Sequence, residues 1–202
     1  LEDFNCRYHI SQISSSKSLS IINNKKEQID FTTGVSINNL SLNENDIGDF
    51  RTFLKLSPPL RTEEDRQSLI RGINKDLIEV LVSDHKPEDE ESKRLTFSQA
   101  ATGASGIETL LPLSLELFHN NSIKLPKIIK LLTSNPAKVL KVDKGNLSIG
   151  NDADFCIVDI NKPWIVKKEK MISKSKNTCI EDKKLQGKVT NTFVKGVELF
   201  KL

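Results

Sequence analysis

The feature that most constrains the fold is a regular alternation of strand-like and helix-like segments from residue 7 to about residue 132. Within it, residues 78–83 form a near-continuous apolar run, as expected for a parallel strand that is covered on both faces. This alternation predicts an α/β fold with parallel strands. The predicted strands are 7–14, 29–36, 50–57 and 78–83, and the predicted helices are 15–27, 62–74, 107–120 and 125–132.

The pattern changes after about residue 140, where short apolar runs are separated by glycine and asparagine. Residues 145–160 contain two candidate strands, and residues 187–202 predict a hairpin with its turn at Lys195-Gly196. Between these segments, residues 162–188 hold nine lysines and three acidic residues. Such a run could bind an anionic partner, but it is more often a solvated loop face, and we expect no nucleic-acid partner.

Composition is that of an ordinary soluble globular protein. The 202 residues include 30 Lys+Arg and 27 Asp+Glu, and the resulting net charge of +3 is no argument for nucleic-acid binding. No run of about 18 apolar residues is present, so we expect no membrane-spanning helix. The three cysteines lie far apart, which argues against a disulfide framework and predicts reduced thiols in a cytoplasmic protein.

Candidate catalytic chemistry lies at the end of the apolar strand, in residues 83–88 (SDHKPE). In a parallel α/β barrel, catalytic groups lie at the carboxyl ends of strands. An aspartate there, Asp84, could ligate a metal or take a proton from a metal-bound water. The alternative is that Asp84 caps the next turn and His85 is a solvated loop residue, and the dipeptide alone favours this alternative.

A second candidate is the glycine-containing loop within residues 100–113, which leads into a predicted helix. Gly103 and Gly106 would let a ligand approach backbone N–H groups near a helix start, which suits an anionic substrate. The alternative is an ordinary connection with two permissive glycines. A bare GxxG pattern does not decide between these interpretations.

Seven segments, in the same order, resemble the C-terminal half of a class I-type dihydroorotase of the amidohydrolase superfamily. The resemblance implies the C-terminal half of a TIM-type (β/α)8 metal-dependent hydrolase barrel plus a small β-sandwich segment. Residues 1–140 would be the second half of the barrel, with strands five to eight, and residues 141–202 the β-sandwich segment. The seven segments are 55–66, 84–87, 103–113, 131–140, 145–159, 175–182 and 187–196.

The resemblance also implies an activity. Dihydroorotases interconvert N-carbamoyl-L-aspartate and L-dihydroorotate in pyrimidine biosynthesis, usually with one or two zinc ions. By this comparison Asp84 is the catalytic residue and, if a metal is bound, a metal ligand. The implied substrate-binding residues are His85, Ala101, Gly103 and Gly106.

Several positions depart from the family pattern. A histidine that ligates the metal after strand five is Gln12 here, and a histidine pair after strand six is Asn38-Asn39. The substrate-binding asparagine before PPLR is Ser57, and the last histidine of the DHAPH motif, which resembles a substrate-carboxylate contact, is Glu88. A carboxylate at that position repels an anionic substrate. Asp84 alone cannot hold a catalytic zinc, which needs about three protein ligands.

These departures predict that zinc is absent or weakly bound, and they leave two main hypotheses. The first is a zinc-dependent cyclic-amide hydrolase in which Asp84 shuttles the proton. The second is a non-catalytic subunit that assembles with aspartate transcarbamoylase. A third, weaker option is a related amidohydrolase acting on another cyclic amide without the usual metal pair. Because half a barrel has open sheet edges, we expect the N-terminal half as a separate chain, a removed segment or a partner copy, and we expect an oligomer.

Overall fold

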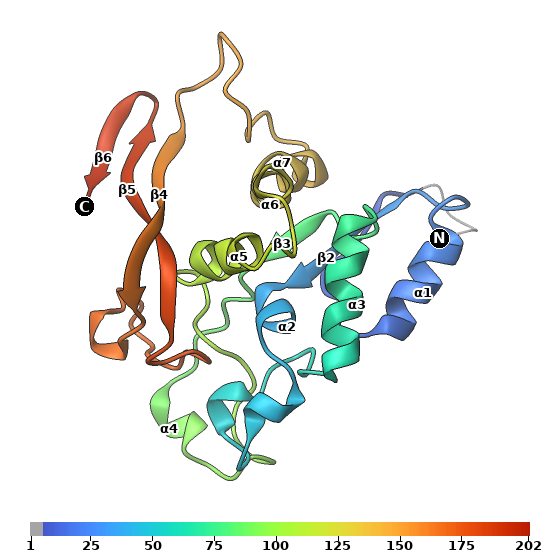
Figure 1. Cartoon of the computed structure of the whole chain (residues 1–202), viewed down its shortest axis with the longest axis vertical. Coiled ribbons are helices and arrows are strands. Elements are labelled where there is room, and N and C mark those ends of the chain that lie inside the picture. The colour runs from blue at the N-terminus through green and yellow to red at the C-terminus, as the bar shows by residue number, and fades with distance from the viewer. Residues whose placement is uncertain (1–5) are drawn as a thin grey trace. The chain divides into compact units, whose positions relative to one another are not determined.

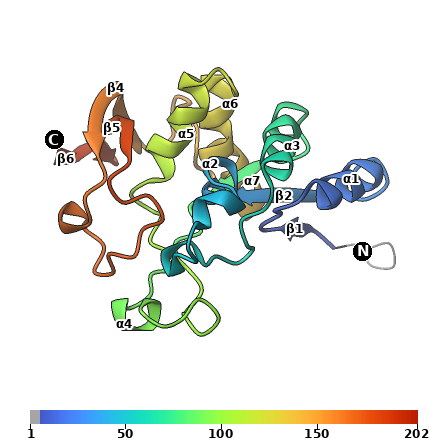
Figure 2. The same ribbon diagram turned by 60° about the horizontal axis from the view of Figure 1, so that its bottom comes forward.

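The computed structural model describes residues 6–202, which fall into two compact units. Unit 1 runs to Leu110 and includes Lys167–Glu181; unit 2 consists of Leu111–Val166 and Asp182–Leu202. The course of the chain can be followed by colour in Figure 1 and, from a second direction, in Figure 2. The domain boundary predicted at residue 140 rests on the family resemblance and stays a prediction.

Unit 1 contains a parallel three-stranded sheet in the order β1-β2-β3. Its strands are Tyr8–Ile10, Phe31–Ser36 and Val80–Val82. Tyr8 pairs with Phe31, and Gly34 pairs with Val80, so all three carboxyl ends point toward the same edge of the sheet. The predicted parallel arrangement is therefore confirmed for these three strands.

The helices of unit 1 begin where the sequence provides caps. The Ser15 hydroxyl accepts the Ser18 N–H at the start of α1, and the Thr62 hydroxyl accepts the Asp65 N–H at the start of α3. In Figure 1, α1 and α3 lie side by side. The helices predicted at 15–27 and 62–74 are confirmed. The helical elements are α1 (Ser16–Lys25), α2 (Ile37–Ser41), η1 (Glu44–Ile47), η2 (Thr52–Leu54), α3 (Glu63–Asn74), α4 (Glu90–Lys93) and η3 (Lys168–Lys170).

The strand predicted at residues 50–57 is wrong. Residues Thr52–Leu54 form a 3-10 turn, because the N–H groups of Leu54 and Lys55 donate to carbonyl groups three residues earlier. Leu54 and Leu56 are buried, whereas Lys55 between them is not, so the apolar alternation is real. The alternation identified the buried side chains, but the backbone hydrogen bonds are local rather than between strands.

Unit 2 combines helices with an antiparallel sheet in the order β4-β5-β6. The predicted hairpin is confirmed, since Lys195 and Gly196 both have positive φ, 49° and 78°, in the turn between β5 and β6. Within residues 6–202, no helix is long and apolar enough to cross a membrane. The elements are α5 (Leu110–His119), α6 (Leu125–Leu132), α7 (Ser134–Leu140), β4 (Phe155–Ile165), β5 (Lys184–Val194) and β6 (Val197–Lys201).

One expectation for this unit needs correction, and a second is not confirmed. The helices predicted at 107–120 and 125–132 form, but residues 145–160 supply one strand, β4, rather than two. Residues 145–154 make short-range turns instead, with the N–H of Asn151 donating to the carbonyl of Ser148. The described residues 141–202 contain one antiparallel sheet, so the predicted β-sandwich is not confirmed.

Replacing the α3 cap, Thr62→Ala, is expected to lower the free energy of unfolding by about 1 kcal/mol, because the Asp65 N–H loses its acceptor. Ser20→Ala, on the exposed face of α1, is the matched control and should change that free energy by less than about 0.5 kcal/mol. Urea denaturation followed by circular dichroism measures both. Equal effects of the two substitutions would show that the cap does not stabilise α3.

Candidate functional site

The predicted site residues occupy two adjoining segments at the carboxyl edge of the parallel sheet. Asp84 and His85 follow β3, and the 101–106 loop runs beside them. A parallel bridge pairs His85 with Ala104, and the Lys86 N–H donates to the Ala104 carbonyl at 2.9 Å. Tertiary pairing therefore brings the two sequence candidates into one region of unit 1.

Asp84 is the buried anion of this region. The residue is only 8% exposed. Its Oδ1 accepts a hydrogen bond from Gln12 Nε2 at 2.8 Å and forms an ion pair with Lys86 Nζ at 3.2 Å. Gln12 follows β1 and Asp84 follows β3, so the Gln12–Asp84 bond spans the end of the central strand β2.

The side chains around Asp84 do not fit a zinc site. Both of its described partners, the Gln12 amide N–H and the Lys86 ammonium group, present hydrogen atoms to the carboxylate, whereas a zinc ligand set consists of atoms that donate lone pairs. Within residues 6–202, no cluster of three or more His, Cys, Asp or Glu side chains is arranged to hold a metal. Asn38 and Asn39 are each 3% exposed, and Asn39 Nδ2 donates to the Pro59 carbonyl at 3.1 Å.

His85 is held by the glycine loop rather than lying free in solvent. Its Nδ1 accepts the N–H groups of Gly106 and Ile107, at 3.2 and 3.4 Å. The Gly103 N–H donates to the Lys55 carbonyl at 3.0 Å. The two glycine N–H groups thus have partners within the protein, and their role in binding a substrate stays a prediction.

Gly103 has a clear steric reason to be glycine. Its φ is 145°, and a Cβ at this position would lie 2.7 Å from Lys86 Cβ. Only a residue without a side chain lets the loop approach the Lys86 backbone so closely. The pairing that positions Asp84, His85 and Lys86 against the loop therefore depends on Gly103.

Lys93 is a buried cation that the sequence analysis missed. The residue is 1% exposed, and its Nζ donates to the carbonyl groups of Ala101 and Gly103, at 2.8 Å each. Burial lowers the pKa of this ammonium group. In the sequence, Lys93 belongs to a charged stretch that is typical of a solvated helix. No local signal therefore identifies its ammonium group as a hydrogen-bond donor to the backbone of residues 101–103.

Asn177 is the second missed residue, and it joins three segments of unit 1. It is 2% exposed, and its Nδ2 donates to the Gly103 carbonyl at 3.1 Å. Its Oδ1 accepts the Ser105 hydroxyl at 3.2 Å and the Glu88 N–H at 3.3 Å. Asn177 lies in the lysine-rich run, and nothing in the composition of that run indicates that this amide is buried.

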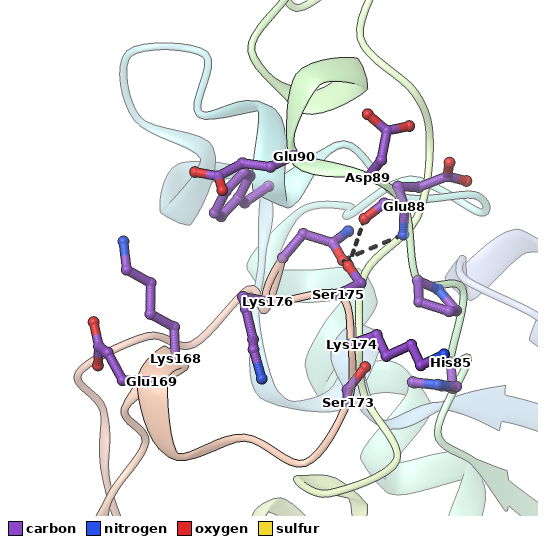
Figure 3. Close-up of a pocket in the computed structure, with 13 residues that line it drawn as sticks. His85, Glu88, Asp89, Glu90, Lys168, Glu169, Ser173, Lys174, Ser175 and Lys176 are labelled. Carbon is purple, nitrogen blue, oxygen red and sulfur yellow. Dashed lines mark hydrogen bonds between the residues drawn. The ribbon is translucent and has the colours of Figure 1, made fainter.

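A pocket of about 950 Å³ lies beside these contacts. In Figure 3, the acidic residues 88–90 lie in the upper part of the view, and lysines of the 168–176 segment lie in the lower part. Lysines of the run expected to be a solvated loop face therefore help to line a pocket of mixed charge. The lining residues are Phe53, His85, Pro87, Glu88, Asp89, Glu90, Lys168, Glu169, Ser173, Lys174, Ser175, Lys176 and Asn177.

Comparison with known proteins gives a consistent family assignment. Residues 17–199 match the model of the amidohydrolase family. The chain is 41% identical over 193 residues to a dihydroorotase of Ehrlichia canis, covering 95% of this chain and 43% of that protein. It is 38% identical over 194 residues to a dihydroorotase of Aquifex aeolicus, covering 96% of this chain and 46% of that protein. The chain therefore spans about half the length of these relatives.

The solved structures agree on the fold. An L-hydantoinase (dihydropyrimidinase) from Arthrobacter aurescens superposes with a TM-score of 0.92 at 26% identity. The superposition covers 99% of this chain and 46% of the hydantoinase chain. The described α/β arrangement is therefore a fragment of the fold of these enzymes.

Removing the Asn177 amide, Asn177→Ala, is expected to lower the free energy of unfolding by about 1–3 kcal/mol, because the Glu88 N–H, the Gly103 carbonyl and the Ser105 hydroxyl each lose a hydrogen bond. Asn45→Ala, at an exposed position of unit 1, should have little effect. Denaturant titration measures the stability, and amide hydrogen exchange should show faster exchange at Glu88 than at β2. An unchanged exchange rate at Glu88 would contradict the assigned contacts.

The lowered pKa of Lys93 predicts a pH dependence of stability. Between its folded value and its ordinary value of 10.5, the unfolded chain binds a proton that the folded chain does not. The contribution of Lys93 to the free energy of unfolding is therefore fully present above pH 10.5. It is lost as the pH falls through the pKa that Lys93 has in the folded protein. The unfolding free energy of the wild type, minus that of Lys93→Met, should rise with pH below 10.5. Denaturant titrations over this range measure the difference, with exposed Lys17→Met as control; a flat difference would contradict the shift.

Proposed function

The chain belongs to the amidohydrolase family, and we propose that it is part of a dihydroorotase-like protein of pyrimidine biosynthesis whose Asp84 centre is not a working metal site. The family reaction is the interconversion of N-carbamoyl-L-aspartate and L-dihydroorotate. Relatives from Ehrlichia canis and Aquifex aeolicus carry the name dihydroorotase and align along nearly all of this chain. The proposal is that the scaffold of this family is kept while its metal chemistry is lost.

The observation that carries the proposal is the set of partners of the Asp84 carboxylate. The Lys86 ammonium group lies 3.2 Å from Oδ1, and a divalent cation on the same carboxylate would be repelled by it. Gln12 stands where the resembled family has a histidine ligand, and its amide N–H group donates a hydrogen bond to Asp84. The ion pair with Lys86 balances the charge of the buried carboxylate, and the hydrogen bond from Gln12 satisfies it further, without a metal ion.

The competing hypothesis is an active, zinc-dependent cyclic-amide hydrolase. In its favour, Asp84 follows the carboxyl end of a parallel strand, where a barrel enzyme places catalytic groups. It requires metal ligands from elsewhere in the protein and a displacement of the Lys86 ammonium group. The non-catalytic hypothesis needs neither, and for this reason we favour it.

For the non-catalytic protein we propose assembly with aspartate transcarbamoylase and with the rest of a barrel. The strands β1 and β3 are the two edges of the parallel sheet, and sheet edges carry N–H and C=O groups that another strand can pair. A separate chain, another segment of the same protein or a second copy could provide those strands. The cytoplasmic location is part of the same proposal.

The proposal predicts that the full-length protein purifies without stoichiometric zinc and shows no dihydroorotase turnover. Because Asp84 would have no catalytic task, Asp84→Asn should leave the background rate unchanged. Elemental analysis and a coupled assay in both directions measure these properties, with exposed Asp49→Asn as matched control. Stoichiometric zinc together with a turnover that Asp84→Asn abolishes would disprove the proposal. Copurification with aspartate transcarbamoylase tests the partner independently.

A further inference from the structure

Unit 2 holds a second pocket, of about 590 Å³, that the proposed function does not use. Its lining comes from the carboxyl-terminal end of α5, from the end of β4 and from the start of β5. A volume of this size is typical of pockets that take one small organic molecule. We propose that this pocket binds a free nucleoside, with the base stacked on the indole ring of Trp164.

Trp164 provides a flat platform that is fixed before a ligand arrives. Its Nε1–H donates to the Gly187 carbonyl at 3.1 Å, and the Lys188 ammonium group lies 4.9 Å from the centroid of its ring. Lys188 occupies one face of the indole, which leaves the other face for a second planar group. Aromatic side chains stack with any base, because every base has a π face.

An irregularity in β4 orients a hydrogen-bond acceptor of the pocket. The register shifts between Asp159 and Pro163, so residues 160–162 stand opposite a single residue of β5. Ile160 has no partner in this register, and its carbonyl is bound by His119 Nε2 at 3.0 Å. Since a carbonyl only accepts, Nε2 carries the proton, and Nδ1 of the neutral imidazole is an acceptor. His119, which lines the pocket, is therefore set to accept an N–H group of a base.

Two amide side chains add the donors and acceptors that a base requires. Asn120 and Gln186 both line the pocket and are exposed. Each amide combines N–H donors with a carbonyl acceptor, and such an amide forms paired hydrogen bonds with the edge of a base. An aromatic platform beside two amides and an imidazole acceptor therefore suits a nucleobase better than a purely apolar ring.

The charges of the lining favour a neutral ligand. Glu116 lines the pocket, but its Oε2 is paired with Lys183 Nζ at 2.8 Å. Lys184 adds one positive charge to the lining, whereas a nucleic-acid backbone is followed by a row of cations. The lining therefore selects a free nucleoside over a nucleic-acid strand. The inference does not rest on the proposed function, because Asp84 belongs to unit 1.

The test is a calorimetric titration of the full-length protein with uridine, with adenosine and with 5,6-dihydrouridine. Dihydrouridine keeps the hydrogen-bonding edge of uridine, but its saturated ring is not planar and stacks poorly. The wild type should bind both nucleosides, and it should bind uridine at least about fivefold more tightly than dihydrouridine, the lower end of the range for one stacked base.

Variants of the pocket separate stacking from hydrogen bonding. Trp164→Leu should weaken uridine binding about 5–100-fold, because the platform is lost. Trp164→Phe keeps an aromatic ring and should retain part of the affinity, so the test stays decisive if Trp164→Leu fails to fold. His119→Gln keeps an N–H donor for the Ile160 carbonyl but lacks the Nδ1 acceptor, and it should weaken binding about 2–10-fold.

Phe200→Leu is the matched control, because Phe200 is an exposed aromatic residue of unit 2 that does not line the pocket. It should bind uridine like the wild type. A wild type that binds neither nucleoside, or that binds dihydrouridine as tightly as uridine, overturns the proposal, as does a Trp164→Leu variant with unchanged affinity. A uridine oligonucleotide that binds more than about tenfold more tightly than uridine in low salt would point to a nucleic-acid strand instead. Zinc content and turnover test the proposed function separately.

Discussion

Parallel pairing of β2 with β1 and β3 is the constraint on which the candidate site depends. It places the residues that follow three separate strands at one edge of the sheet, although Gln12 and Asp84 are 72 positions apart in the chain. The hydrogen bond between them crosses the end of the central strand. Without this pairing, the buried carboxylate of Asp84 and the amide of Gln12 would not meet.

The same edge holds a buried carboxylate, Asp84, whose charge needs a partner. A buried carboxylate must be balanced by a metal, a cation or hydrogen-bond donors, since an unpaired charge in the interior is costly. Here the balance comes from the Lys86 ammonium and the Gln12 amide. Such a balance keeps Asp84 stable in its place whether or not the centre has any catalytic task.

The 101–106 loop depends on polar groups that are buried beneath it. The Gly103 carbonyl accepts hydrogen bonds from both Lys93 and Asn177, which approach from α4 and from the 167–181 segment. A backbone held by two buried side chains keeps one conformation, and it fixes the position of His85 through the Gly106 N–H. The lysine-rich segment thus contacts the loop through the side chain of an asparagine, Asn177.

Local signals in the sequence determined the local structure. The Thr62 cap with its acidic first turn and the Lys195-Gly196 turn act over a few residues, so α3 and the β5–β6 hairpin could be predicted directly. The order of the segments and the resemblance they carry were also enough for the family and for the position of Asp84. Residues 50–57 show the limit, because two buried leucines with polar neighbours suit a strand and a 3-10 turn equally well.

Only the tertiary structure decided what surrounds these elements. The burial of Lys93, the contacts of Asn177 with the 88 and 103–105 segments and the pairing of Asp84 with Gln12 each join residues whose partners lie elsewhere in the fold. No pattern within a few residues distinguishes a buried lysine from a solvated one, since burial depends on which other segments pack over it. The sequence by itself therefore determined the family, most of the elements and the location of the candidate site, while packing determined which charges that site holds.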